Sequence, residues 1–254
     1  MFMNKRSFRC RRAAVRGGGL WEVEVRDLTK TFGRVTAVRG MSFTAPAGKV
    51  TGFLGPNGSG KTTTLRTLLG LVRADSGEAL LGGLPYGHLD RPRRTVGALL
   101  ETNGFHPGRR ARDHLRILAD GAGISSPRVD EVLGQVGLSA AARRRVREFS
   151  LGMRQRLGLA AALLGDPRVL LLDEPANGLD PAGIAWLRGM LRALADEGRT
   201  IVVASHVLSE IAQAADHVVI VSAGQVRFAG PLTEIAATNT ALESAFLKLT
   251  AAPG

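Results

Sequence analysis

Apolar residues recur along this chain in patterns that are typical of β-strands. Residues 21–28 (WEVEVRDL) alternate between apolar and polar, as a strand with one buried face does. Other runs are short and almost wholly apolar, which is typical of strands that are covered on both faces. Strands are expected at residues 21–28, 35–44, 96–100, 169–173 and 199–205, and a terminal hairpin at 217–230.

Helical and turn signals lie between these strands. Residues 49–71 predict a strand, a glycine-rich loop and a helix in succession, and residues 76–83 (SGEALLGG) predict a turn-rich hairpin. Two segments near the C-terminal end, residues 181–198 and 207–216, have the helical period. Alternation of strands with helices predicts a mainly parallel sheet with helices on both faces, which makes the fold class α/β.

The middle of the chain has a different character. Residues 109–165 have helical periodicity and no convincing strand, with breaks at residues 121–123, Pro127 and Gly137. We therefore expect a helical subdomain, about residues 102–165, inserted into the α/β domain between two of its strands.

Length and composition agree with a globular protein. The 254 residues fit one large domain that carries an inserted subdomain, and the apolar content of 44% is enough for a full core. No apolar stretch approaches the roughly 18 to 20 residues that a membrane-spanning helix needs. The single cysteine, Cys10, excludes an intramolecular disulfide and suits a reducing compartment, so we expect a cytoplasmic location.

Positive charge is concentrated at the N-terminus. Residues 1–20 contain six basic and no acidic residues, without the apolar run of a signal sequence, and predict a disordered basic tail before a domain at 21–254. The formal net charge is +12, so about half of the excess belongs to this tail. Two explanations of the remaining excess stay open: an arginine-rich composition with solvated surfaces, and attraction to an anionic membrane surface or a membrane partner.

The glycine-rich loop is a candidate phosphate site. Residues 55–62 (GPNGSGKT) fit the pattern G-x-x-x-x-G-K-[ST] between a predicted strand and a predicted helix, which is the context that this motif requires. Glycines let consecutive backbone N–H groups converge on phosphate oxygens, and the helix N-terminus adds partial positive charge. Lys61 supplies a full charge for the β- and γ-phosphates, and Thr62 a hydroxyl ligand for Mg²⁺.

Two adjacent acids, Asp173 and Glu174, end the apolar run LLLDE. A buried carboxylate is costly unless a cation or hydrogen bonds compensate it. Ligands of open parallel sheets gather at the carboxyl ends of the strands, so both acids are expected to face the phosphate loop. Asp173 is the predicted metal ligand, and Glu174 is free to polarise a water for attack on the γ-phosphorus. A salt bridge alone is the other explanation for Glu174.

A third motif, FSLGMRQR at residues 149–156, predicts the start of a helix. Ser150 suits the N-cap position, and Gly152 permits a close approach of the backbone to a ligand. Taken with the phosphate loop, LLLDEP, the NGLD segment and His206 in VVASH, it makes the chain resemble the ATPase subunits of ATP-binding cassette (ABC) transporters. The resemblance covers about residues 21–250 and extends to the order and spacing of all five motifs.

The resemblance implies a P-loop NTPase core with an antiparallel N-terminal β-subdomain, and a homodimer that closes around two ATP–Mg²⁺. Lys61, Glu174 and His206 would be catalytic, with His206 contacting the γ-phosphate, and Thr62, Glu101 and Asp173 would serve the metal. Phe32 in KTFG would stack on adenine, and Ser150, Gly152 and Asp180 would complete the site of the second subunit. The nucleotide-binding positions are Phe32, Gly55, Pro56, Asn57, Gly58, Ser59, Gly60, Lys61, Thr62, Thr63, Ser150, Gly152 and Asp180.

Two departures from the usual family pattern narrow the resemblance. Glu101, in ALLETNGFHP, stands where glutamine is usual, and Leu151 and Met153 replace glycine and glutamine of the signature. With the ending LESAFLKLT, these features resemble the bacitracin-resistance and lantibiotic-immunity branch, whose ATPases drive a separate ABC-2-type permease. The resemblance thus implies a peripheral protein on the cytoplasmic face of the membrane, active in antibiotic, peptide or multidrug export.

Two other functions are weighed against this one. A soluble ABC-type ATPase that acts on ribosomes or nucleic acid is suggested by the basic charge, but such relatives carry two cassettes or long coiled-coil insertions, so no nucleic-acid partner is expected. A regulatory subunit that binds ATP without hydrolysing it is disfavoured by the intact set Lys61, Asp173, Glu174 and His206. The sequence leaves open which substrate is transported and whether the second ATPase subunit is a copy or a paralogue.

Overall fold

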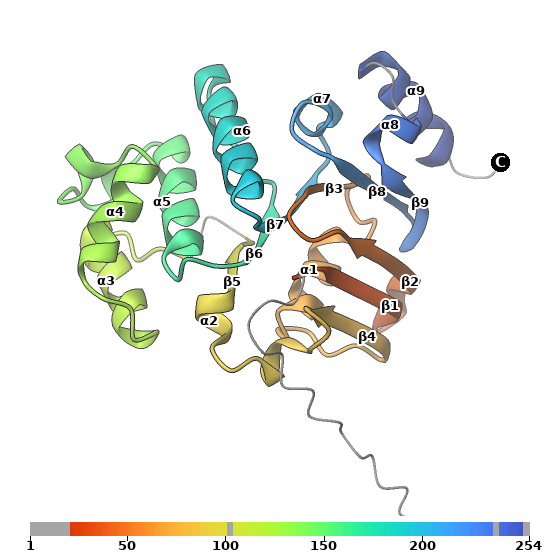
Figure 1. Cartoon of the computed structure of the whole chain (residues 1–254), viewed down its shortest axis with the longest axis horizontal. Helices are drawn as coiled ribbons and strands as arrows, with labels where there is room; N and C mark the ends of the chain where they lie inside the picture. The colour runs from red at the N-terminus through yellow and green to blue at the C-terminus, as the bar shows by residue number, and fades with distance from the viewer. Residues whose placement is uncertain (1–20, 101–103, 236–238, 251–254) are drawn as a thin grey trace, which may run out of the picture.

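A computed structural model describes residues 21–100, 104–235 and 239–250 of the chain. The predicted tail at 1–20 and the candidate metal ligand Glu101 lie outside the described residues. The strands that are described form two sheets, one of three strands and one of six. Figure 1 shows the three-stranded sheet at one end of the molecule and a group of helices, α3 to α5, at the other. The α/β class with an antiparallel N-terminal sheet is therefore confirmed.

The three-stranded sheet is antiparallel, with β1 in the middle. It consists of β1 (Val23–Phe32), β2 (Val35–Ala45) and β4 (Ser76–Leu81). The sequence pattern was wrong about the hairpin at 76–83, because this segment is one strand whose partner is β1, about 50 residues earlier. A tight turn, in which Leu81 bridges to Leu84, ends β4 and produced the hairpin-like signal.

The six-stranded sheet has the order β5-β6-β7-β3-β8-β9, and all pairs except β8–β9 are parallel. Its strands are β3 (Val50–Leu54), β5 (Val96–Leu99), β6 (Val169–Asp173), β7 (Thr200–Ser205), β8 (His217–Ser222) and β9 (Gln225–Pro231). Leu54 pairs with Ser205, and Asp173 pairs with Ala204, so β3, β6 and β7 end at the same edge. This register brings the loop after β3 and the acids that end β6 together.

Helices flank the sheet on both sides. Residues 109–165 contain no strand, as expected, but hold α3, α4, α5 and two short 3-10 turns (Figure 1). The predicted helix at 207–216 is shorter in the structure, and α2, α8 and α9 were not predicted. The helices are α1 (Lys61–Leu68), α2 (Pro92–Thr95), α3 (Ala111–Gly121), α4 (Pro127–Gln135), α5 (Leu151–Leu163), α6 (Pro181–Asp196), α7 (Leu208–Ala212), α8 (Leu232–Ile235) and α9 (Asn239–Thr250).

The six-stranded sheet separates two hydrophobic clusters. Successive side chains of a strand point to opposite faces, and in β6 the residues Leu170 and Leu172 join one cluster whereas Val169 and Leu171 join the other. The first cluster includes side chains of α3 to α6, and the second includes those of β1 and β2. Both faces of the central strands are thus buried, which explains why their sequences are continuously apolar.

Candidate active site

The phosphate loop, residues 55–60, runs from the end of β3 to the start of α1. Gly58 and Gly60 have φ angles of 80° and 101°, which residues with a Cβ adopt only with strain. A Cβ on Gly60 would also lie 2.5 Å from the carbonyl oxygen of Ala37. The loop therefore needs glycine at both positions. Loops of this kind bind phosphate through backbone N–H groups that converge on its oxygens.

Lys61 lies across this loop. Its Nζ donates hydrogen bonds to the carbonyl oxygens of Gly55 at 2.7 Å and Pro56 at 3.2 Å. The side chain is buried, and burial lowers the pKa of the Lys61 ammonium from its ordinary value, while the carboxylates of Glu174 and Asp173 oppose this shift. The loop carbonyls thus hold the charge at the mouth of the phosphate loop.

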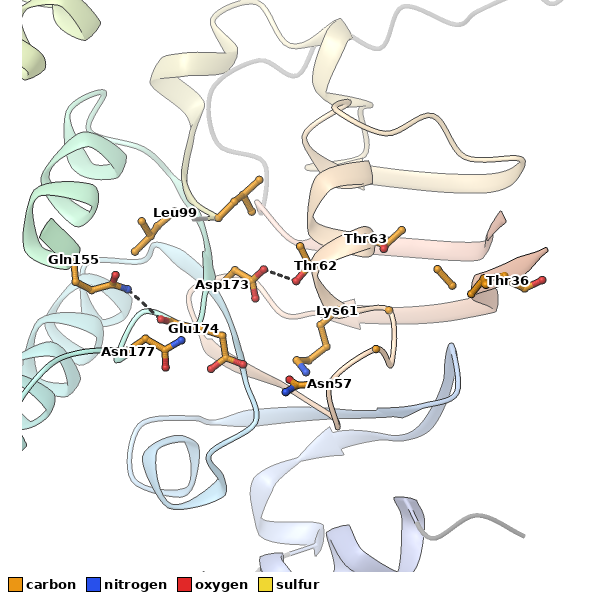
Figure 2. A pocket seen from close by; sticks show the side chains of 15 residues that line it. Thr36, Asn57, Lys61, Thr62, Thr63, Leu99, Gln155, Asp173, Glu174 and Asn177 are labelled. Carbon is orange, nitrogen blue, oxygen red and sulfur yellow. Dashed lines mark hydrogen bonds between the residues drawn. The ribbon is translucent and has the colours of Figure 1, made fainter. Parts of the chain in front are cut away.

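Thr62, at the first turn of α1, joins this loop to β6. Its Oγ1 donates a 2.6 Å hydrogen bond to Oδ2 of Asp173 (Figure 2). Asp173 is only 7% exposed, and burial raises the pKa of its carboxyl, against the opposing effect of the Thr62 hydrogen bond. A hydroxyl and a carboxylate side by side are oxygen ligands of the kind that Mg²⁺ prefers.

Glu174, the next residue, has an unusual backbone. Its φ angle is 49°, in the left-handed region that residues with a Cβ rarely adopt. Its N–H donates to the carbonyl of Ala204 in β7 at 2.9 Å, and its carbonyl accepts from the N–H of Asn177 at 3.2 Å. The carboxylate Oε1 lies 2.8 Å from Nδ1 of His206, the residue after β7. The surrounding strands thus fix the Glu174–His206 pair.

These groups surround one cavity of about 560 Å³. Figure 2 shows Lys61, Asp173 and Glu174 facing each other across it. The lining residues are Val35, Thr36, Ala37, Asn57, Gly58, Gly60, Lys61, Thr62, Thr63, Leu99, Leu100, Gln155, Asp173, Glu174 and Asn177. The tertiary structure therefore brings together the two motifs at residues 55–62 and 173–174, which are more than 100 residues apart in the sequence.

Some predicted residues stand beside the cavity. Within the described part of the chain, Gly55, Pro56 and Ser59 belong to the phosphate loop but do not line it, and His206 is joined to it through Glu174. Phe32 lies at the turn before Val35, which does line the cavity. The Phe32 ring is 50% exposed and carries the Nζ of Lys30 5.2 Å from its centroid. An exposed ring here is available to a planar group that enters the cavity.

Ser150, Gly152 and Asp180 form a second group, here called the α5 tip, outside the cavity wall. Ser150 is the N-cap of α5, and its Oγ accepts from the N–H of Met153 at 3.2 Å. Asp180 is the N-cap of α6 and accepts from the N–H of Gly183 at 2.7 Å. The two segments touch, since a Cβ on Gly152 would lie 3.0 Å from the carbonyl oxygen of Gly178. The structure therefore gathers these residues on one surface but not at the chain's own phosphate loop.

Sequence reasoning gave no role to Gln155, which lines the cavity and is 1% exposed. Its Nε2 donates to the backbone carbonyl of Glu174 at 3.1 Å. A signal was present, because Gln155 is a polar residue on the side of α5 that otherwise turns Leu159 and Leu163 inward at four-residue spacing. A polar residue in such a row marks a buried polar contact.

Comparison with known proteins identifies the family. The ABC transporter family model matches residues 38–177, which is more than half of the chain. The bacitracin transport ATP-binding protein BcrA of Bacillus licheniformis is 44% identical over 207 residues, covering 80% of this chain and 68% of that protein. The lantibiotic transport ATP-binding protein SrtF of Streptococcus pyogenes is 36% identical over 204 residues, covering 80% and 88%.

Solved structures agree with the sequence comparison. The structure of an ATP-binding subunit of an ABC transporter superposes with a TM-score of 0.80 at 26% identity, covering 89% of this chain and 98% of that one. CbiO1 of Clostridium perfringens, part of the transporter complex cbiONQ, superposes with a TM-score of 0.76 at 25% identity, covering 91% and 96%. Among the helices that the structure describes, none has the length and apolar character to cross a membrane. The chain belongs to the ABC transporter family and is an ATP-binding, ATP-hydrolysing subunit of that family.

Proposed function

We propose that the cavity binds ATP with Mg²⁺ and that two copies of the chain close around two nucleotides to drive a separate membrane permease. The hydrogen bond between Thr62 and Asp173 supports this most directly. It joins the helix that follows the phosphate loop to the end of β6, so a hydroxyl and a carboxylate stand next to the cradle that phosphate would occupy. A buried carboxylate is costly unless a cation or hydrogen bonds compensate it, so Asp173 at that point favours a bound cation.

The residues present fit the nucleotide and the ion. Gly58 and Gly60 have φ angles of 80° and 101°, so the loop can curve around a phosphate group, and the ammonium of Lys61 at its mouth supplies a full positive charge. Thr62 and Asp173 would hold the metal, since Mg²⁺ in such sites takes one or two protein ligands and completes its shell with water and phosphate. Bound Mg²⁺ would neutralise the charge that develops on the phosphate oxygens.

In the proposed reaction, water attacks the γ-phosphorus while the bond from that phosphorus to the bridging oxygen of the β-phosphate breaks, so that ADP and inorganic phosphate leave. Lys61 would hold the β- and γ-phosphates, exchanging its bonds to Gly55 and Pro56 for phosphate oxygens. Glu174 would accept the proton of the attacking water, and His206 Nδ1–H would orient its carboxylate through the 2.8 Å contact. Phe32 would stack on the adenine ring.

The α5 tip supports a composite site. Ser150 and Gly152 lie at the N-terminus of a 13-residue helix, where backbone N–H groups and the helix dipole favour an anion. They lie outside the chain's own cavity, so a second copy would have to offer the phosphate. Asp180, on the adjoining loop, would lie at the same contact. A symmetric dimer in which each α5 tip meets the partner's γ-phosphate satisfies both sites.

The relatives suggest the transport role. BcrA and SrtF are named for bacitracin transport and lantibiotic transport. By this similarity, the chain would serve an exporter of antibiotics, peptides or other drugs. It would work as a peripheral subunit on the cytoplasmic face of the membrane, bound to a permease of separate sequence.

The Glu174→Gln variant tests the proposal. The neutral amide keeps the shape of the side chain but cannot accept a proton, so ATP turnover should fall by about 10²- to 10³-fold while ATP still binds. ATP should then convert the purified monomer into a stable dimer, which size-exclusion chromatography with light scattering detects. Glu131→Gln, an exposed change on α4, is the matched control and should behave like the wild type. Full turnover in Glu174→Gln would remove Glu174 from its role as base, and a persistent monomer would contradict the composite site.

A further inference from the structure

The helix that carries the α5 tip also reaches into the chain's own cavity. Gln155 stands five residues after Ser150, about 7.5 Å further along the helix axis. Its Nε2 donates to the carbonyl oxygen of Glu174 at 3.1 Å (Figure 2). Helix α5 therefore links the α5 tip, which is proposed to contact a second copy, with the main chain of the predicted base, Glu174.

The Glu174 main chain needs such support. Its φ angle of 49° is unfavourable for a residue with a side chain, and such conformations persist only where surrounding contacts hold them. Ala204 holds its N–H, while Asn177 and Gln155 hold its carbonyl oxygen. Of these three contacts, that of Gln155 is the one made by a side chain, so it can be removed without changing the backbone.

Helix α5 packs tightly against β5. A Cβ at Gly158 would lie 2.6 Å from a methyl carbon of Leu99 in β5, and a Cβ at Gly97 would lie 2.1 Å from the carbonyl oxygen of Ala162. The backbones of α5 and β5 are thus in direct contact at Gly97 and Ala162, and Gly158 packs closely on the side chain of Leu99. A shift of the α5 tip would move Gln155 with it.

The chemistry of the side chain also indicates a polar role. Gln155 is buried, yet its Oε1 accepts no hydrogen bond from any described residue. Leaving a buried acceptor unpaired is unfavourable, and an apolar residue of the same length would avoid it. An amide is useful here because its N–H donates a hydrogen bond to the Glu174 carbonyl, which an apolar side chain could not do.

We propose that Gln155 is a positioning residue that holds the Glu174 backbone in its left-handed conformation and couples the α5 tip to the base in the same chain. Contact of the α5 tip with the nucleotide of a second copy would then align Glu174 at the chain's own nucleotide. The inference rests on the proposed role of Glu174. It assigns to α5 a function in both sites of the dimer.

Gln155→Leu is the first test, in the purified full chain. Removal of the hydrogen bond should lower kcat by roughly 10- to 100-fold, as small misplacements of catalytic groups do. KM and the affinity for a fluorescent ATP analogue should stay within about twofold, because Gln155 has no predicted nucleotide contact. The matched control, Gln135→Leu at the exposed end of α4, should leave both constants unchanged. Turnover of Gln155→Leu within twofold of the wild type would overturn the inference.

Gln155→Glu separates the hydrogen bond from mere packing. A neutral glutamic acid can donate its O–H to the Glu174 carbonyl, whereas the carboxylate cannot, and burial beside Asp173 and Glu174 favours the neutral form. The ratio of variant to wild-type kcat should therefore increase as the pH is lowered from 8 to 6. For Gln155→Leu the same ratio should be independent of pH. Equal, pH-independent losses in both variants would contradict the hydrogen-bond role.

Two measurements keep the outcome interpretable. Thermal unfolding identifies a variant that has lost its fold. If Gln155→Leu does not fold, Gln155→Asn replaces it, because the asparagine side chain is shorter by one methylene and would not reach the Glu174 carbonyl oxygen. Glu174→Gln in the same assay tests the base separately. If Glu174→Gln is inactive and the Gln155 variants are fully active, the coupling inference alone fails; if Glu174→Gln turns over normally, the proposed function fails.

Discussion

The cavity and the α5 tip are the two halves of the proposed composite site, and they differ in how far one chain organises them. In the cavity, Lys61 and Asp173 are buried, Thr62 is partly buried, and all three are already hydrogen-bonded within one chain. At the α5 tip, Ser150 and Asp180 are exposed, and their side chains do no more than cap the helices that they begin. The cavity is organised by a sheet edge within one chain, whereas the α5 tip would act only against the nucleotide of a second copy, as proposed above. In the proposed dimer, ATP binding would therefore belong to the single subunit and hydrolysis to the pair.

The largest expected effect comes from mixing two variants, one defective in the cavity and the other in the α5 tip. Lys61→Ala removes the cation of the cavity and should lower turnover by about 10³-fold. Ser150→Asp keeps a good N-cap but puts a negative charge where the partner's phosphate would arrive, so it should also lose turnover while binding ATP. A 1:1 mixture should regain up to roughly a quarter of wild-type activity, since half of the dimers contain one intact composite site. Steady-state ATPase assays of each variant and of the mixture measure this.

Ser150→Asn is the control for that experiment. Asparagine caps a helix as well as aspartate does but carries no charge, so a loss confined to Ser150→Asp would be electrostatic. A mixture with no activity above the two separate variants would mean that the halves do not complement each other across a dimer.

Phe32→Ala should have a smaller effect, limited to binding. Loss of a stacking ring costs about 1–3 kcal/mol per base, so ATP affinity should fall by roughly tenfold with kcat at saturation unchanged. Isothermal titration with ATP measures the affinity, and Phe32→Trp should retain it. Equal affinities of the wild type and Phe32→Ala would assign the exposed ring to some role other than adenine stacking.

Asp173→Asn should raise the stability of the nucleotide-free protein and weaken its response to ATP–Mg²⁺. Because burial raises the pKa of this carboxyl in the folded protein, its ionised form destabilises the fold as pH rises through that pKa. The nucleotide-free variant should therefore be more stable than the wild type by about 0.5–2 kcal/mol at pH 8. The difference should shrink as pH falls and disappear where the aspartate is protonated in both the folded and the unfolded state.

Urea unfolding of the nucleotide-free proteins at pH 8 and pH 5 measures this difference. ATP–Mg²⁺ should stabilise the wild type but not Asp173→Asn, because the variant lacks the anionic metal ligand. A variant less stable than the wild type at pH 8 would show that the Thr62–Asp173 hydrogen bond outweighs the cost of burying the charge.

Much of the cavity could be predicted from the sequence, because the sequence signals of its phosphate loop are local. The strand, glycine loop and helix at 49–71 are adjacent in sequence, and their conformations follow from glycine content and apolar period. Ser150 as N-cap followed from its position before a helical segment. The hairpin prediction at 76–83 failed because the partner of β4 is β1, and no local pattern specifies a pairing across about 50 residues. Helix α8 is only four residues long and helix α9 is only weakly amphipathic, so no local periodic pattern predicted either helix.

The sequence by itself determined which residues could bind phosphate, cap helices and serve as base, because these abilities depend on side-chain chemistry and local spacing. Only the tertiary structure decided that Asp173 meets Thr62, that Glu174 adopts φ of 49° beside His206, and that Gln155 reaches its carbonyl. Those contacts depend on strand order and register in the six-stranded sheet, which arise from burial of both faces at once rather than from any single segment.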